Sequence, residues 1–141
     1  MDIKPVTPDF AVADQVTASD LEQLKQLGYQ TLICNRPDGE TEGQPTADSL
    51  AAAAEAMGFG WAWIPISSGV FTDEAVAAFA AALNGHAKPA LAFCRTGTRS
   101  VTLWALSQAG LQPAEALLSQ AAAAGYDLSA HARRLADRHQ A

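Results

Sequence analysis

Short apolar runs alternate with amphipathic stretches along most of the chain. Turn-forming residues bound each run, which is typical of short buried strands. These strands are predicted near 10–12, 30–35, 61–66 and 89–93. The intervening stretches carry capping residues and helix-ending glycines, and so predict helices. The helices are expected near 19–27, 47–57, 72–83, 100–109 and 113–125, with a last one beginning at Ser129.

The order of these elements predicts an α/β fold. Strands that alternate with helices form a parallel sheet covered on both faces and joined by right-handed crossovers. We expect a parallel four-stranded sheet flanked by about six helices, in a single domain over residues 1–141. A site in such a sheet lies beyond the carboxyl ends of the strands. This rule singles out the loops at 36–45, 67–72 and 94–100.

Composition and charge narrow the functions open to this chain. With 141 residues, 49% of them hydrophobic, the chain can bury a core of its own. A net charge of -6 argues against non-specific nucleic-acid binding, which needs clustered Lys and Arg. Uncharged stretches are interrupted by Pro and Gly, and the N-terminus lacks a basic region followed by an apolar core. We therefore expect a cytoplasmic protein with neither nucleic acid nor membrane as a partner.

Cysteines and histidines give little support for a metal site. Cys34 and Cys94 are too few for a disulfide framework or a thiolate-rich zinc site. The histidines show no HExxH or other paired spacing. We expect no metal, and nothing in the sequence implies an organic cofactor.

The clearest chemical signal is the segment 94–100, which reads Cys-Arg-Thr-Gly-Thr-Arg-Ser. It directly follows an apolar run and directly precedes a predicted helix. Successive backbone N–H groups of such a turn can point inward, Gly97 permits the torsions required, and the helix N-terminus adds positive charge. The segment therefore predicts an anion-binding loop.

Within this loop, Cys94 is the predicted nucleophile. Amides, a helix N-terminus and arginines favour the thiolate, so we expect Cys94 to ionise more readily than a free cysteine. Arg99 is predicted to bind the anion through its planar fork, and Arg95 to screen charge at the mouth. Ser100 is expected to hydrogen-bond the thiolate or to cap the helix. The other predicted anion-binding residues are Thr96, Gly97 and Thr98. The alternative is a buried strand-end cysteine with no chemistry.

The chain resembles the bacterial beta-lactamase-hydrolase-like, phosphatase-like domain family. The likeness extends over almost the whole chain. It rests on FAVADQ at 10–15, NRPDGE at 35–40, GQP at 43–45, IPI at 64–66, the CRTGTRS loop, LWAL at 103–106 and AGYDL at 124–128. The resemblance implies a dual-specificity-phosphatase-like fold with the cysteine loop between the last strand and the following helix. It also implies a cysteine-based activity, either phosphatase-like or sulfur transfer, in a domain sometimes fused to a persulfide dioxygenase.

Two features of the residues bear on that choice. Four residues stand between Cys94 and Arg99, whereas cysteine-dependent protein phosphatases have five, usually with His before the Cys, where this chain has Phe93. The shorter loop resembles active rhodanese-type sulfurtransferases and should suit a single terminal sulfur. A phosphatase also benefits from a carboxylic acid at the leaving group. Asp73 is interpreted as a helix-opening residue, and Asp38 as a turn residue that is also a candidate acid.

We therefore expect a rhodanese-type sulfurtransferase in which Cys94 carries a persulfide. Its donor would be a small sulfur-containing anion and its acceptor a thiol, and the family resemblance adds a persulfide dioxygenase as a further partner. The first alternative is a cysteine-dependent, phosphatase-like hydrolase of phosphomonoesters. The second is a non-catalytic module that only binds an anion.

Residues outside the loop have two interpretations each. Arg36 either faces the same anion or pairs with Glu40, and the pairing is favoured. Cys34 is either a resolving thiol for Cys94 or a small buried residue, and the second is favoured. Tyr126 follows Gly125 after a helix, which indicates helix termination rather than catalysis. The tryptophans are interpreted as core residues. They are Trp61, Trp63 and Trp104.

Overall fold

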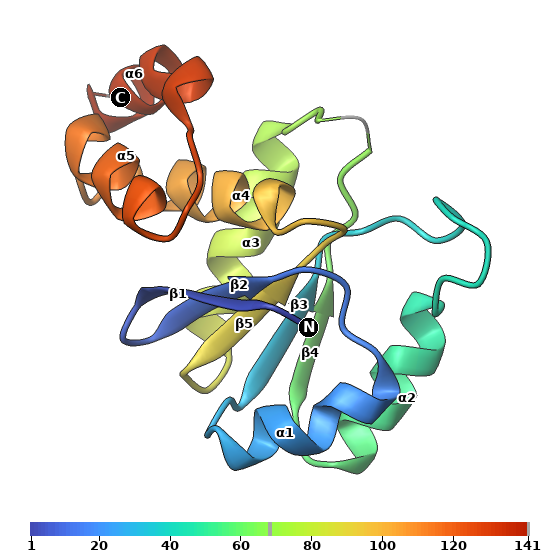
Figure 1. Cartoon of the computed structure of the whole chain (residues 1–141). Helices are drawn as coiled ribbons and strands as arrows, with labels where there is room; N and C mark the ends of the chain where they lie inside the picture. The colour runs from blue at the N-terminus through green and yellow to red at the C-terminus, as the bar shows by residue number, and fades with distance from the viewer. Residues whose placement is uncertain (68, 141) are drawn as a thin grey trace.

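The computed structural model describes residues 1–67 and 69–140. Within these residues, five strands form one sheet with helices on both faces (Figure 1). The strands are β1 (Ile3–Thr7), β2 (Phe10–Ala13), β3 (Thr31–Cys34), β4 (Gly60–Trp63) and β5 (Ala90–Phe93). The α-helices are α1 (Leu21–Gln26), α2 (Ala47–Ala56), α3 (Asp73–Gly85), α4 (Thr98–Gln108), α5 (Ala114–Ala123) and α6 (Ala132–Gln140). Short 3₁₀ helices precede α1 and α6, namely η1 (Ala18–Asp20) and η2 (Ser129–His131).

The sheet has the strand order β1-β2-β5-β3-β4. The four predicted strands are parallel, and β5 lies between β2 and β3. The α/β fold is thus confirmed, but the prediction of four strands is wrong, because β1 pairs antiparallel with β2 at the edge of the sheet. Pro5 lies inside β1, and a proline within an apolar run argues against a strand except at a sheet edge, where its missing N–H needs no partner.

Helices cover the two faces of the sheet with two separate cores. Figure 1 shows α1 and α2 on one face and α3 and α4 on the other, with α5 and α6 packed outside α4. Leu24 and Leu50 pack with Leu32 of the sheet on the first face. The larger core lies on the second face. Among the described helices, none has the length and apolar character required to cross a bilayer.

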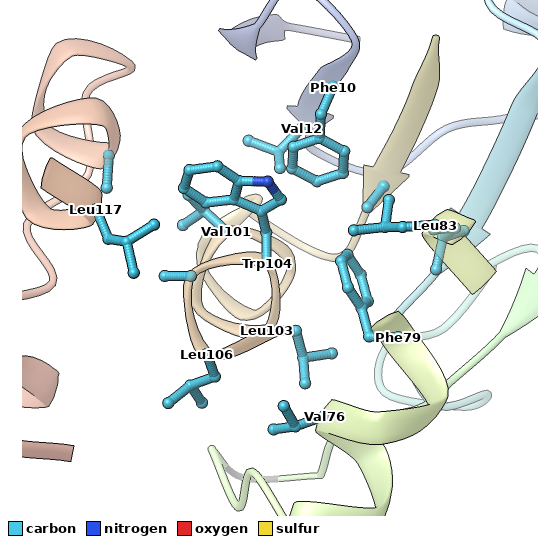
Figure 2. Close-up of a cluster of buried hydrophobic side chains, with 14 of the residues drawn as sticks. Phe10, Val12, Val76, Phe79, Leu83, Val101, Leu103, Trp104, Leu106 and Leu117 are labelled. Carbon is cyan, nitrogen blue, oxygen red and sulfur yellow. The ribbon is translucent and has the colours of Figure 1, made fainter. Parts of the chain in front are cut away.

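Trp104 lies in the middle of the larger core and fixes α4. Figure 2 shows α4 between α3 and α5, with the indole of Trp104 facing Phe10. The two rings are stacked, with centroids 5.8 Å apart and planes 8° apart. Phe79 of α3 meets Phe10 edge to face, with centroids 6.0 Å apart. This packing holds the helix whose N-terminus follows the cysteine loop.

The two tryptophans of β4 differ in burial. Trp61 is half-buried and packs against Phe93, with ring centroids 6.2 Å apart, so its core interpretation is confirmed together with that of Trp104. The core interpretation of Trp63 is wrong, because its side chain is 42% exposed. β4 is the edge strand on this side of the sheet, and Trp63 at its end is its one exposed residue. The indole Nε1 of Trp63 donates to the Arg36 carbonyl at 3.0 Å.

Candidate active site

Three loops meet at the carboxyl edge of the parallel strands, as predicted. They surround a polar cavity of about 460 Å³. Its lining residues are Arg36, Glu40 and Thr41 from the loop after β3, Gly69 from the loop after β4, Arg95 from the loop after β5, and Arg99 from the first turn of α4. Ser68, within the predicted 67–72 loop, lies outside the described residues.

A second cavity of about 470 Å³ lies at the α5 end of the molecule and is more apolar. Its lining residues are Leu118, Ala122, Gly125, Tyr126, Asp127, Leu128 and Ser129. These residues include no thiol and no guanidinium. The arginines that the sequence predicts to bind an anion line the polar cavity, whereas Tyr126 lines the apolar cavity and, with Arg95, a smaller one beside the cysteine loop.

Cys94 directly follows the central strand β5 and is fully buried. Its Sγ accepts a hydrogen bond from the Gly97 N–H at 3.1 Å. Gly97 is the N-cap of α4 and has a φ of 90°, a conformation that favours glycine. The turn thus aims a backbone amide at the sulfur, which is the arrangement expected of an anion-binding loop.

The other residues of the loop face outward. Arg95, Thr96 and Thr98 are exposed. The hydroxyls of the two threonines hydrogen-bond one another at 3.0 Å. Arg95 lines the polar cavity and also a smaller neighbouring cavity beside Tyr126. Its role in screening charge at the mouth of the site stays a prediction.

Arg99, in the first turn of α4, is held along one edge of its guanidinium. Nη1 donates to Glu40 Oε2 at 2.8 Å and to the Ile66 carbonyl at 2.9 Å, and Nη2 donates to Glu40 Oε1 at 2.8 Å. Among the described residues, these bonds leave the Nε–H and one Nη2–H, which lie side by side on the other edge. The pKa of Arg99 is raised, first by the hydrogen bond to Glu40 and further by the nearby Cys94 sulfur. That second edge can bind two oxygens of an anion.

Glu40 connects the two arginines of the cavity. Its Oε1 also accepts from Arg36 Nε at 2.9 Å. The hydrogen bond from Arg99, with a smaller effect from Arg36, lowers the pKa of Glu40 to about 2. The carboxylate is therefore ionised at neutral pH, where it orients Arg99 and has no proton to donate. Sequence reasoning missed this role, although the position of Glu40 in a loop at the same sheet edge was a usable signal.

Arg36 holds Glu40 in place from the buried side of the loop. Its side chain is almost fully buried, and each guanidinium nitrogen has a side-chain partner. Besides Glu40, Nη1 donates to Gln15 Oε1 at 3.0 Å and Nη2 donates to Thr41 Oγ1 at 3.3 Å. The favoured pairing with Glu40 is confirmed, and these bonds hold Arg36 in a supporting place at the cavity wall.

Asp38, the candidate acid, and Asp73, interpreted as a helix-opening residue, both lie at helix N-termini. Asp38 Oδ1 accepts from the Ala47 N–H, the first of α2, at 2.8 Å. Asp38 is not among the described residues that line the polar cavity. Asp73 is the first residue of α3 and pairs with Arg138 at 3.0 Å. Among the described residues, Glu40 thus lines the cavity, whereas Asp38 and Asp73 do not.

The expectations for Ser100 are wrong. Its Oγ donates to Asn35 Oδ1 at 2.8 Å, and both residues are fully buried. Asn35 Nδ2 in turn donates to the Ile64 carbonyl at 3.0 Å. The cap of α4 is Gly97. Ser100 and Asn35 therefore fasten the start of α4 to the ends of β3 and β4, and Asn35 escaped sequence reasoning because a lone asparagine has no distinctive pattern.

Cys34 fits the interpretation of a small buried residue. It is 3% exposed and belongs to the core that faces α1 and α2. Its Sγ donates to the Arg36 carbonyl at 3.6 Å. Burial raises the pKa of Cys34 to about 11, which disfavours the thiolate that a resolving cysteine must form.

Comparison with known proteins agrees with this geometry. The sequence profile of the family described as "Beta-lactamase hydrolase-like protein, phosphatase-like domain" matches residues 2–111. The chain belongs to this family. The beta-lactamase hydrolase-like protein of Agrobacterium fabrum is 34% identical over 100 residues, which are 71% of this chain and 23% of that protein. The chain thus spans about a quarter of the length of the curated relative it matches.

Solved structures with the same fold include phosphatases. A candidate phosphatase from Neisseria meningitidis superposes with a TM-score of 0.85 and 34% identity, over 98% of this chain and 99% of that one. Tk-PTP in its active form superposes with a TM-score of 0.71 and 17% identity, over 98% and 95% of the two chains. The phosphatase-like fold that the family resemblance implied is confirmed.

Proposed function

We propose that this protein is a cysteine-dependent phosphatase that hydrolyses phosphomonoesters with Cys94 as the nucleophile. One observation carries the proposal: the Gly97 amide points at the Cys94 sulfur, and Arg99 keeps a two-donor edge for an anion beside it. Membership of a phosphatase-like family and the similarity to phosphatase structures support the same reaction. This choice reverses the order of the two activities expected from the sequence.

The reaction has two steps. The Cys94 thiolate attacks phosphorus, an S–P bond forms, and the P–O bond to the leaving group breaks. The leaving oxygen keeps the bonding electrons and takes a proton from water. Water then attacks the phosphocysteine, the S–P bond breaks, and inorganic phosphate and the thiolate are released. Arg99 and the loop amides stabilise the charge on the phosphoryl oxygens in both steps.

The carboxylates near the site bear on the choice of substrate. Glu40, with a pKa of about 2, is ionised, and Asp38 accepts a hydrogen bond from the N-terminus of α2. Neither side chain is placed to protonate a leaving group. We therefore propose that the preferred substrates have leaving groups of low pKa, such as phenols, which depart without a general acid.

Sulfur transfer is the second candidate, and the four-residue spacing between Cys94 and Arg99 favours it. In that reaction the thiolate attacks the outer sulfur of thiosulfate, an S–S bond forms, and sulfite leaves. An acceptor thiolate then takes the outer sulfur of the persulfide and restores the Cys94 thiolate. A persulfide dioxygenase would be a partner that consumes the resulting persulfide.

A paired assay distinguishes the two reactions. The wild type, Cys94→Ser and the matched control Cys34→Ser are incubated separately with p-nitrophenyl phosphate and with thiosulfate. We expect phosphate release and a trapped phosphocysteine on Cys94 by mass spectrometry, lost in Cys94→Ser and retained in Cys34→Ser. A persulfide on Cys94 without phosphocysteine would replace the proposal with sulfur transfer. Neither adduct, with anion binding unchanged in Cys94→Ser, would indicate a binding module.

A further inference from the structure

Tyr126 reaches the cysteine loop from the turn between α5 and η2. Its hydroxyl donates to the Thr96 carbonyl at 2.9 Å. The same peptide unit carries the Gly97 N–H, which donates to Cys94 Sγ at 3.1 Å. In a trans peptide the C=O and N–H point in opposite directions. One hydrogen bond on each side therefore holds this peptide in a single orientation.

Gly97 does not fix that orientation by itself. Glycine adopts positive and negative φ about equally well, so Gly97 itself does not oppose a turn-over of the Thr96–Gly97 peptide. After such a turn a carbonyl oxygen would face the sulfur and disfavour a negative charge there. The bond from Tyr126 opposes this change. The fit is close, because a Cβ at Gly97 would collide with the Tyr126 hydroxyl.

The turn that carries Tyr126 is itself well bonded. Gly125, with a φ of 101°, ends α5, and the Tyr126 N–H donates to the Ala121 carbonyl at 2.9 Å. On the other side, Asp127 Oδ1 accepts from the Ser129 N–H at 2.9 Å. These contacts agree with the helix-termination interpretation of the sequence. They also give the phenol a fixed frame from which to reach the loop.

The phenol remains a hydrogen-bond donor at neutral pH. Burial raises the pKa of Tyr126, and the nearby Cys94, Asp2 and Asp14 act in the same direction. Lys4 and Arg95 line the same small cavity as the phenol. Tyr126 therefore keeps its proton at neutral pH and can donate to the Thr96 carbonyl.

We propose that Tyr126 is a positioning residue for the reactive thiol: its hydroxyl holds the Thr96–Gly97 peptide so that the Gly97 N–H points at Cys94. The residue lies beyond the segment 2–111 that matches the family profile. The inference rests on the proposed function only in taking Cys94 as the reactive group. It predicts that loss of one distant hydroxyl makes the thiolate harder to form.

The test compares Tyr126→Phe with Tyr29→Phe, which removes the only other phenolic hydroxyl of the chain from a position in the opposite core. Alkylation of Cys94 by iodoacetamide is followed over a range of pH by peptide mass spectrometry, which separates Cys94 from Cys34. We expect Tyr126→Phe to lower the alkylation rate at neutral pH by about tenfold, the effect of losing one hydrogen bond to a charged group. The profile should move to higher pH, and Tyr29→Phe should match the wild type.

Thermal unfolding of both variants separates positioning from stability. A purely structural Tyr126 would lower Tm in Tyr126→Phe and leave the pH profile of alkylation in place, and that result overturns the inference. An unchanged profile with unchanged Tm overturns it too. Because alkylation requires no turnover, a shifted profile in a protein inactive toward aryl phosphates would support Tyr126 and reject only the phosphatase proposal.

Discussion

Two loops at the same edge of the sheet each supply an arginine, and the two side chains share the carboxylate of Glu40. Arg36, in the loop after β3, has a 5% exposed side chain, and each of its guanidinium nitrogens donates to another side chain of the protein. Arg99, in the first turn of α4 that follows the cysteine loop, is 16% exposed and is bonded along one edge only. Among the described residues, each guanidinium uses three of its N–H groups, but those of Arg36 are spread over all three nitrogens, whereas those of Arg99 leave the Nε–H and one Nη2–H side by side on one edge. The arrangement of the used donors therefore decides which arginine can bind an anion.

The loop after β3 is built as a support. The Gln44 side chain donates to the Pro37 carbonyl at 2.8 Å and accepts from the Glu40 N–H at 3.1 Å. Asp38 anchors the same loop to α2. These bonds hold Glu40 in place, whereas the loop after β5 turns its Gly97 amide toward Cys94. One loop fixes a side chain, and the other presents a binding surface.

Replacing each arginine by lysine gives the largest contrast between the loops. In Arg99→Lys we expect kcat/KM for p-nitrophenyl phosphate to fall by about 10² to 10³, because lysine keeps the charge and loses the planar fork. In Arg36→Lys the kinetic loss should be smaller and the loss of Tm larger, since the side-chain acceptors of Gln15, Glu40 and Thr41 lose the donors of a buried guanidinium. Steady-state kinetics and thermal unfolding check both. Equal kinetic losses would contradict the division of roles.

The shared carboxylate gives the next largest effect. Glu40→Gln removes the charge that holds Arg99 along one edge, and we expect kcat/KM to fall about tenfold through loss of orientation. Steady-state kinetics on the aryl phosphate measure the change. An active Glu40→Gln with wild-type kcat/KM would show that Arg99 is positioned by α4 and the Ile66 carbonyl alone.

Glu40→Gln should also change how the free energy of unfolding depends on pH. The pKa of Glu40 is about 2 in the folded chain against an ordinary 4.5, so the ionised form stabilises the fold. That stability is fully present above about pH 4.5 and is lost as the pH falls through about 2. With a side chain 28% exposed, we expect the wild type to exceed Glu40→Gln by about 1 kcal/mol in free energy of unfolding at neutral pH. Denaturant titrations should show this gap closing toward pH 2, and a constant gap would contradict the ion pair.

The sequence predicted the cysteine loop because its chemistry is contiguous. Cys94, Gly97 and Arg99 stand within one strand-turn-helix segment, where spacing alone implies an anion cradle. Their supports come from far along the chain: Arg99 and Glu40 are 59 positions apart, Ser100 and Asn35 are 65, and Tyr126 and Thr96 are 30. Local pattern carries no information about which distant side chains meet.

Tertiary contacts likewise explain the errors outside the loop. β1 was missed because Pro5 argues against a strand unless the edge of the sheet is known. Trp63 was placed in the core because an aromatic in a strand is usually covered, whereas its strand β4 forms a sheet edge. In each case the deciding fact is the neighbour of an element, which the linear pattern of apolar residues does not contain.

Asp38 supplies the smallest and most selective contrast, because it belongs to the supporting loop and was a candidate acid. Its carboxylate bonds the first N–H of α2, so Asp38→Ala should cost about 1 kcal/mol of stability through loss of that acceptor. Asp38→Asn keeps an acceptor oxygen and has no acidic proton, and should keep both the Tm and the kcat of the wild type. Thermal unfolding and kinetics on a substrate with a poor leaving group, such as an alkyl phosphate, measure the two effects. An Asp38→Asn variant with the Tm of the wild type, but with kcat reduced only on the alkyl phosphate, would show that Asp38 is the general acid and has a catalytic role.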